Sequence, residues 1–177
     1  MVMLCFWVFV CGFCCLLELG NTRPDGVNKV KLNEVPASWS NCGKNDLFVV
    51  TQLSFPSVIT IPGSVTFSLK GNLKKDINST IQSQLEVKKK VFGRWITIPC
   101  KNKIGSCFYN DICAVIHHIT AKTCRFKQGE VSIPKTTIKI PKPSIPRFIY
   151  AGDYSITVKL TSRKQSVACL TIKFSLK

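Results

Sequence analysis

The chain has 177 residues, with 25 Lys and Arg against 9 Asp and Glu, which gives a formal net charge of +16. This length suffices for one domain with a hydrophobic core, and the charge favours anionic partners such as acidic lipids, sulfated glycans or nucleic acid. The lysines are scattered over many predicted strands instead of clustering with glycines and aromatic residues, so we do not expect a nucleic-acid-binding module.

Residues 1–20 are predicted to be a signal peptide. Met3 to Leu17 form an apolar run, and Glu18 is the only charged residue among the first twenty. The run is as long as the upper end of a signal-peptide core and short for a membrane span, although an uncleaved membrane anchor is the alternative. Removal of Glu18 with the leader would raise the net charge by one, to +17. Residues 21–37 are polar, basic and without pattern, and are expected to be a flexible N-terminal arm.

Six of the ten cysteines lie beyond the leader. An even number in a secreted chain predicts three disulfides, for which fifteen pairings are possible. Metal binding is not expected, because no Cys-x-x-Cys occurs and His117 and His118 are adjacent, without helical ligand spacing. No cofactor motif is present either.

Strand patterns begin after residue 38. Residues 47–55 and 58–61 are rich in strand-forming residues, and Pro62-Gly63 is a turn signal. Apolar and polar residues then alternate over 64–70 and again in a longer strand that reaches Phe92. Period two with one polar face indicates an antiparallel sheet. Between these strands, Asn78 begins an Asn-Ser-Thr glycosylation acceptor in a polar loop.

The second half of the chain contains the only helical candidate, residues 107–119, and further strand signals. Residues 125–140 predict two short strands, separated by Gly129 and Pro134. Three prolines make 140–146 an extended connection, which an apolar loop at 147–150 follows. Alternation then returns in 154–160 and 168–176. Together these patterns predict an all-β chain, a sandwich or open cup of about eight strands with one short helix.

Five landmarks occur in a fixed order along the chain. They are Ser-Trp-Ser-Asn-Cys42, Ile61-Pro-Gly-Ser-Val-Thr66, Gly93-Arg-Trp-Ile-Thr-Ile-Pro-Cys100, Ile104-Gly-Ser-Cys107, and Phe126-Lys-Gln-Gly-Glu130 followed by Ile133-Pro-Lys135. In this arrangement residues 38–177 resemble the ML lipid-recognition superfamily, and within it the ganglioside GM2 activator branch. The resemblance implies an immunoglobulin-like β-sandwich opened into a lipid-holding β-cup, with disulfides Cys42–Cys169, Cys100–Cys107 and Cys113–Cys124. The branch's fourth disulfide is missing, because the chain lacks the insertion that carries it.

The resemblance also implies where a lipid would lie. Two apolar loops should form a rim that contacts membranes: Val91, Phe92, Trp95, Ile145, Phe148, Ile149 and Tyr150. Trp95 and Phe148 could instead belong to the core. The inward strand faces should line a cavity: Val65, Phe67, Leu69, Leu85, Val87, Tyr154, Ile156, Val158, Leu170, Ile172 and Phe174.

The function implied by the resemblance is non-enzymatic. Such a protein extracts a glycolipid or another acyl lipid from an anionic membrane surface and presents it to a hydrolase, such as a lysosomal β-hexosaminidase, or to an acceptor membrane. Its location would be the lysosome or the extracellular space. The alternative is a secreted basic interaction or defence protein that binds anionic membranes or glycans through surface charge. Catalysis is not expected, because the chain has no Gly-x-Ser-x-Gly elbow and no convincing carboxylate pair.

Overall fold

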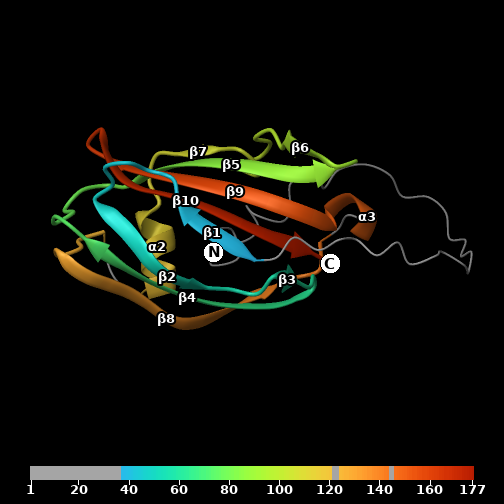
Figure 1. Ribbon diagram of the computed structural model, residues 1–177, viewed down its shortest axis with the longest axis horizontal. Coiled ribbons are helices and arrows are strands. Elements are labelled where there is room, and N and C mark those ends of the chain that lie inside the picture. The colour runs from blue at the N-terminus through green and yellow to red at the C-terminus, as the bar shows by residue number, and fades with distance from the viewer. Residues whose placement is uncertain (1–36, 121–123, 144–145) are drawn as a thin grey trace, which may run out of the picture.

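The computed structural model describes residues 37–120, 124–143 and 146–177. The predicted signal peptide, all but the last residue of the predicted arm, and Ile145 lie outside these ranges. The described chain forms two facing sheets, built almost entirely from antiparallel pairs (Figure 1). The predicted all-β sandwich is therefore confirmed.

The larger sheet has the strand order β1-β10-β9-β5-β6, with β3 paired to β10 and β7 paired to β5. Among the named strands of the described residues, the short β3–β10 pair is the parallel one. The strands are β1 (Ser38–Asn41), β3 (Val58–Ile59), β5 (Gln82–Val91), β6 (Arg94–Thr97), β7 (Phe108–Tyr109), β9 (Gly152–Ser162) and β10 (Gln165–Leu176).

The smaller sheet has the order β2 (Phe48–Ser54), β4 (Gly63–Leu73) and β8 (Gly129–Ile140). The prediction of two short strands over 125–140 is wrong, because β8 runs through Pro134 without a break. Proline lacks the amide proton that a central strand needs, but it is tolerated on an edge strand. β8 is such an edge, and its register with β4 shifts between Phe67 and Leu69.

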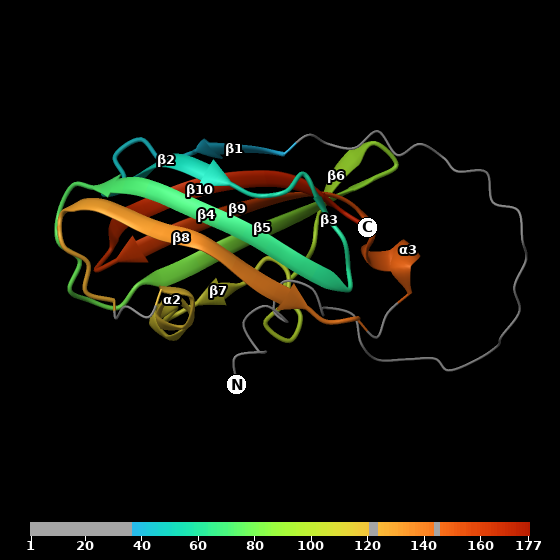
Figure 2. The ribbon, with the colours of Figure 1, turned by 90° about the horizontal axis from the view of Figure 1, so that it is seen from below.

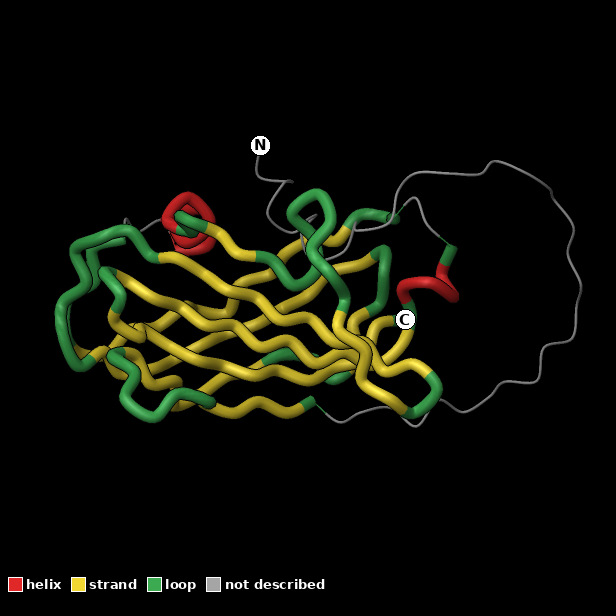
Figure 3. Tube along the Cα trace, turned by 90° about the horizontal axis from the view of Figure 1, so that it is seen from above, coloured by secondary structure: helices red, strands yellow, loops and turns green. Residues whose placement is uncertain are grey.

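In the described part of the chain, two short helices lie well apart from each other (Figure 3). Helix α2 (Cys113–Thr120) overlaps the second half of the predicted helical segment 107–119 and extends one residue beyond it, and it lies between β7 and β8 on one side of the molecule (Figure 2). Helix α3 (Arg147–Tyr150) is a single turn where a loop was expected. The N–H of Ala151 closes it by donating to the carbonyl of Arg147 at 2.8 Å.

The two sheets are joined along the edge formed by β1 and β2. The side chain of Asn41 in β1 both donates to and accepts from the backbone of Val50 in β2, at 2.8 and 3.2 Å. In the connection between these strands, the buried carboxylate of Asp46 accepts bonds from the Ser166 hydroxyl at 2.6 Å and the Cys169 N–H at 2.8 Å. One sheet edge is thereby fixed by polar bonds as well as by packing.

Three disulfides complete the framework: Cys42–Cys169, Cys100–Cys107 and Cys113–Cys124. They are the pairs implied by the family resemblance. The first reinforces the β1–β2 edge, the second closes the loop between β6 and β7, and the third ties the start of α2 to the segment before β8.

We expect the Cys42–Cys169 disulfide to contribute most to stability, because it joins residues 127 apart whereas Cys100–Cys107 joins residues 7 apart. The loop-entropy relation gives about 5 kcal/mol for the first and about 2 kcal/mol for the second. Urea unfolding of the Cys42→Ala/Cys169→Ala and Cys100→Ala/Cys107→Ala variants measures both. Equal losses would contradict the chain-entropy explanation.

Candidate functional site

The space between the sheets holds an apolar cavity of about 190 Å³, which we call the β3-side cavity. Its walls come from β2 and β4 in the small sheet, from β9 and β10 in the large sheet, and from the segment around β3. All its lining residues are apolar: Leu53, Phe55, Ile59, Val65, Phe67, Ile156, Val158, Ile172 and Phe174.

A second apolar cavity of about 190 Å³, which we call the α2-side cavity, lies further along β4 and β9. Phe67 of β4 lines the first cavity and Leu69 the second; Val158 of β9 lines the first and Leu160 the second. The wall of the α2-side cavity is completed by Phe48, Leu73, Ile77, Ile81, Ile116, Phe126, Val131, Ile133 and Val167. Because neither cavity offers a polar side chain, the ligand that fits them is itself apolar.

The hairpin between β5 and β6 projects an aromatic side chain into solvent. Phe92 and Gly93 form its two-residue turn with φ of 47° and 81°, the positive values of a type I′ turn. Such a φ is uncommon for a residue other than glycine, yet here it carries a phenylalanine that is 101% exposed. A phenylalanine that is this exposed buries little apolar surface and contributes little to folding.

Helix α3 places a second exposed aromatic residue at the same end of the molecule (Figures 1 and 2). Phe148 is 81% exposed, whereas Ile149 is half-buried. Exposed cations accompany both aromatic residues, namely Arg94 and Lys90 at the hairpin and Arg147 in α3. The combination of exposed aromatic rings and cations is typical of surfaces that contact a membrane interface.

Lys89 lies between the hairpin and α3 and was not singled out from the sequence. Its ammonium donates to the carbonyl oxygen of Ile149 in α3 and lies 6.0 Å from the centre of the Tyr154 ring. Burial lowers the pKa of this ammonium, because the charged form loses hydration. Because Lys89 is two residues after Val87 in the strand, the alternation could have indicated that it faces inward. The run Lys88-Lys89-Lys90, however, is typical of a solvated strand end.

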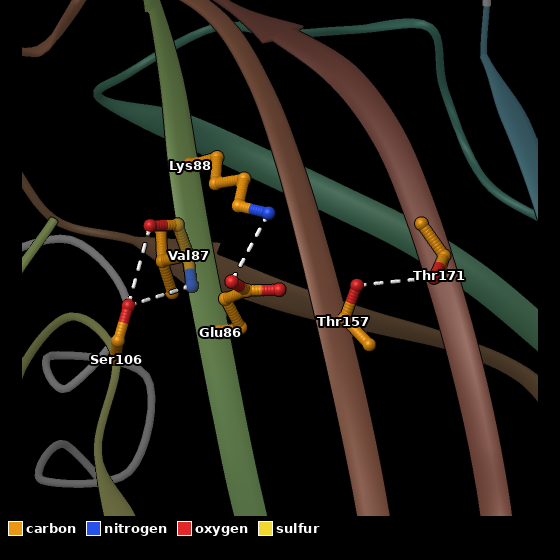
Figure 4. A network of polar contacts seen from close by, with 6 residues as sticks. All are labelled: Glu86, Val87, Lys88, Ser106, Thr157 and Thr171. Atoms are coloured by element: carbon orange, nitrogen blue, oxygen red, sulfur yellow. Dashed lines mark hydrogen bonds and ion pairs between the residues drawn. The ribbon is translucent and has the colours of Figure 1, made fainter. Parts of the chain in front are cut away.

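The outer face of the large sheet has a different character. A groove of about 360 Å³ there is lined by polar groups that include Gln84, Thr97 and Lys159. Next to it, Lys88 pairs with Glu86 at 3.0 Å and the hydroxyls of Thr157 and Thr171 lie 3.0 Å apart (Figure 4). This groove does not suit an acyl chain.

The ML domain family matches residues 36–176. The chain belongs to the ML domain family. It is 32% identical over 157 residues to the ganglioside GM2 activator of Macaca fascicularis, covering 79% of this chain and 83% of that protein. It is 29% identical over 180 residues to the ganglioside GM2 activator of Mus musculus, covering 92% of this chain and 93% of that protein.

Among solved structures, the fold of this ML-domain chain is similar to that of a Niemann-Pick type C2 protein from the Japanese carpenter ant. The TM-score is 0.51 at 15% sequence identity, over 79% of this chain and 99% of that one. At this identity the likeness concerns the fold alone.

The residues predicted to line one cavity lie partly in the two cavities and partly in the core of this ML domain. Six of them line the β3-side cavity and Leu69 lines the α2-side cavity. Val87 and Tyr154 are instead buried in the adjoining core cluster, Leu85 is buried, and Leu170 is partly buried; none of these four lines either cavity. Alternation identified the inward face, but the positions of the gaps depend on packing between the sheets.

The residues predicted to form the rim also differ in where they lie. Phe92 and Phe148 are exposed at one end of the domain, and Val91 is partly buried. Trp95 is 39% exposed and pairs with Lys90 on the face opposite to that of Val87 and Ile96. The placement of Tyr150 at the rim is wrong, because it lies in the core with its hydroxyl donating to the Ile61 carbonyl at 3.1 Å.

Two further features bear on function. Among residues 37–120, 124–143 and 146–177, no group of three His, Cys, Asp or Glu side chains could hold a metal ion, and no helix there is long and apolar enough to cross a membrane. Asn78 is exposed in the segment before β5, where a glycan could be attached.

We expect alkali to destabilise this ML domain through Tyr154. Burial raises the pKa of its phenol, so the unfolded chain loses this proton at about pH 10 while the folded chain keeps it. The stabilisation is therefore present below about pH 10 and falls as the pH rises further.

The Tyr154→Phe variant should show a shallower decline above about pH 10. At neutral pH it should lose about 1 kcal/mol, because the Tyr154 hydroxyl no longer donates to the Tyr150 carbonyl, a bond of 2.7 Å. Urea unfolding at several pH values tests this. Parallel declines for wild type and variant would show that Tyr154 is not responsible.

Proposed function

We propose that this ML-domain protein takes a lipid out of a membrane and carries its acyl chains between the two sheets. The main support is the pair of apolar cavities that follow one another along β4 and β9. Similarity to proteins named ganglioside GM2 activator supports a lipid ligand, and specifically a glycolipid.

Each cavity is about 190 Å³, smaller than the roughly 300–1,000 Å³ of usual ligand pockets. We therefore propose that one acyl chain occupies both cavities in series, after the side chains of Phe67 and Leu160 give way between them. A methylene exposed to water would cost about 0.8 kcal/mol, so a dry cavity must replace the apolar surroundings of the bilayer for each methylene that it takes up.

In this mechanism the end of the domain that bears Phe92 and Phe148 contacts the membrane. The two rings enter the interface, while Arg94 and Arg147 extend to anionic headgroups. The headgroup of the extracted lipid stays at this end, where a hydrolase such as a β-hexosaminidase, or an acceptor membrane, meets it. The protein itself performs no bond cleavage.

The proposed location is the secretory pathway, with the lysosome or the extracellular space as destination. Three disulfides suit an oxidising compartment. A leader over residues 1–20 and a glycan on Asn78 would agree with this route.

A second candidate function is adhesion to anionic membranes or glycans through surface charge alone. The observation that favours it is the net charge of +16, which is the excess of 25 Lys and Arg over 9 Asp and Glu. Adhesion of this kind weakens strongly as the salt concentration rises, whereas the binding of a lipid in a dry cavity does not.

We expect the Phe92→Ala/Phe148→Ala variant to extract lipid from vesicles at least about tenfold more slowly than wild type, because two aromatic rings no longer enter the interface. Transfer of a fluorescent galactosylceramide between vesicles measures this rate. The matched control is Phe108→Ala, which removes a ring that is also exposed, at 58%, but lies in β7 beside the outer groove. Equal rates for all three proteins would contradict the proposed rim.

Filling the β3-side cavity should abolish lipid binding without abolishing adhesion. Val158→Trp puts an indole into the cavity at a cost of about 1–3 kcal/mol in stability. Lys159→Trp, on the outer face of the same strand, is the control. Native mass spectrometry after incubation with galactosylceramide should find lipid on the control and none on Val158→Trp. If the wild-type protein holds no lipid but binds acidic vesicles and releases them in high salt, the result would favour the surface-charge function.

A further inference from the structure

Lys89 is an inward-facing cation in a chain whose other inward positions nearby are apolar. Across the large sheet, Phe174 pairs with Tyr154, Tyr154 with Lys89, and Lys89 with Ile96. Side chains that are paired in this way lie on one face of the sheet. Since Phe174 lines the β3-side cavity and Tyr154 belongs to the core, this face is the inner one.

The same row leads from the cavity to the solvent. Phe174 forms the cavity wall and stacks on Tyr154 with 6.0 Å between ring centres. Lys89 follows, and Ile96 at the end of the row is 51% exposed. A lipid with its chains beside Phe174 and its headgroup at the open end would therefore have its polar part at the level of Lys89.

Within the described residues, the Lys89 ammonium forms no ion pair. One of its three N–H bonds donates to the Ile149 carbonyl. The distance of 6.0 Å from the ammonium to the centre of the Tyr154 ring is near the upper limit for a cation–π contact. The nearest acid along β9, Asp153, precedes Tyr154 and therefore faces the other side, where it accepts a bond from Ser175 at 2.7 Å. Partial burial without a counter-charge has a cost, which the lowered pKa of Lys89 reflects.

We propose that Lys89 selects lipids whose headgroup carries an oxyanion, such as a carboxylate, sulfate or phosphate, by donating its free N–H bonds to that group beneath α3. This inference rests on the proposed lipid-binding function and adds the chemical class of the headgroup. An oxyanion supplies the charge that the site lacks, and charge-assisted bonds in a partly dehydrated place are stronger than those in water. Arg94 and Arg147, both exposed, would act on the membrane surface and not on the bound lipid.

The competing explanation is that Lys89 only holds α3 in place through the Ile149 carbonyl. The two explanations differ in what they require of the side chain. Holding α3 needs a hydrogen-bond donor, which glutamine also provides, whereas selecting an oxyanion needs a positive charge, which arginine retains.

The test is a direct competition between two lipids that differ only in the anion. The full chain, secreted from eukaryotic cells, is incubated with equal amounts of galactosylceramide and 3-sulfogalactosylceramide with the same acyl chain, and native mass spectrometry gives the ratio of the two complexes. We expect wild type and Lys89→Arg to prefer the sulfated lipid by about tenfold or more. Lys89→Gln and Lys89→Met should bind both lipids equally.

Lys88→Met is the matched control. It removes the same charge from the neighbouring position, where the side chain faces outward and pairs with Glu86, so it should keep the wild-type preference. Thermal unfolding of each variant verifies folding, and the presence of galactosylceramide on Lys89→Gln verifies that the cavity still works.

The outcomes separate the two proposals. If wild type holds both lipids without preference, or if Lys89→Gln keeps the preference, the role of Lys89 is overturned while lipid binding stands. If wild type holds neither lipid, the proposed function itself fails, and the role of Lys89 with it. If free galactose 3-sulfate binds with the same Lys89 dependence and removes the preference at equal concentration, the site recognises a soluble anion and the assignment to a lipid headgroup is wrong.

Discussion

The structure depends on one constraint: the two sheets are fixed to each other along the β1–β2 edge. The Asn41 side chain of β1 bonds to Val50 of the smaller sheet, and the Cys42–Cys169 disulfide and the buried Asp46 carboxylate hold the connection from β1 to β2 against β10. With this edge fixed, the opposite side does not have to be closed by strand pairing, and α2 lies there between β7 and β8 (Figure 2). A sandwich held in this way can keep apolar space between its layers.

That space exists because the inner faces do not interdigitate fully. Two buried clusters lie between the sheets, one centred on Tyr154 and one on Leu73. Close packing within them gives the fold its stability, and the two cavities adjoin them. Gly71 of β4 illustrates how closely side chains pack within the smaller sheet, since a Cβ atom there would lie 2.4 Å from the ring of Phe48 in β2, which lines the α2-side cavity. Stability and ligand capacity are therefore supplied by neighbouring but different residues.

The features at the end that bears α3 conflict with folding stability and so point to function. Phe92 is fully exposed on a turn with positive φ, Phe148 is exposed on a single helical turn, and Lys89 is partly dehydrated without a counter-charge. Contact with a membrane would remove the two rings from water, and an anionic headgroup would neutralise the lysine. The proposed ligand, an amphiphile with an anionic headgroup, would suit all three features.

The sequence by itself determined the all-β class and the inward face of most strands, because these follow from local alternation, and it located the segment that contains most of α2. It did not determine the continuity of β8 through Pro134, which depends on the edge position of that strand. Nor did it place Tyr150 in the core or the Lys89 ammonium against the Ile149 carbonyl, since both contacts depend on how α3 packs against the large sheet. Whether an inward residue lines a cavity or fills the core was decided only by the tertiary structure, because a gap is a property of two facing layers and not of either strand alone.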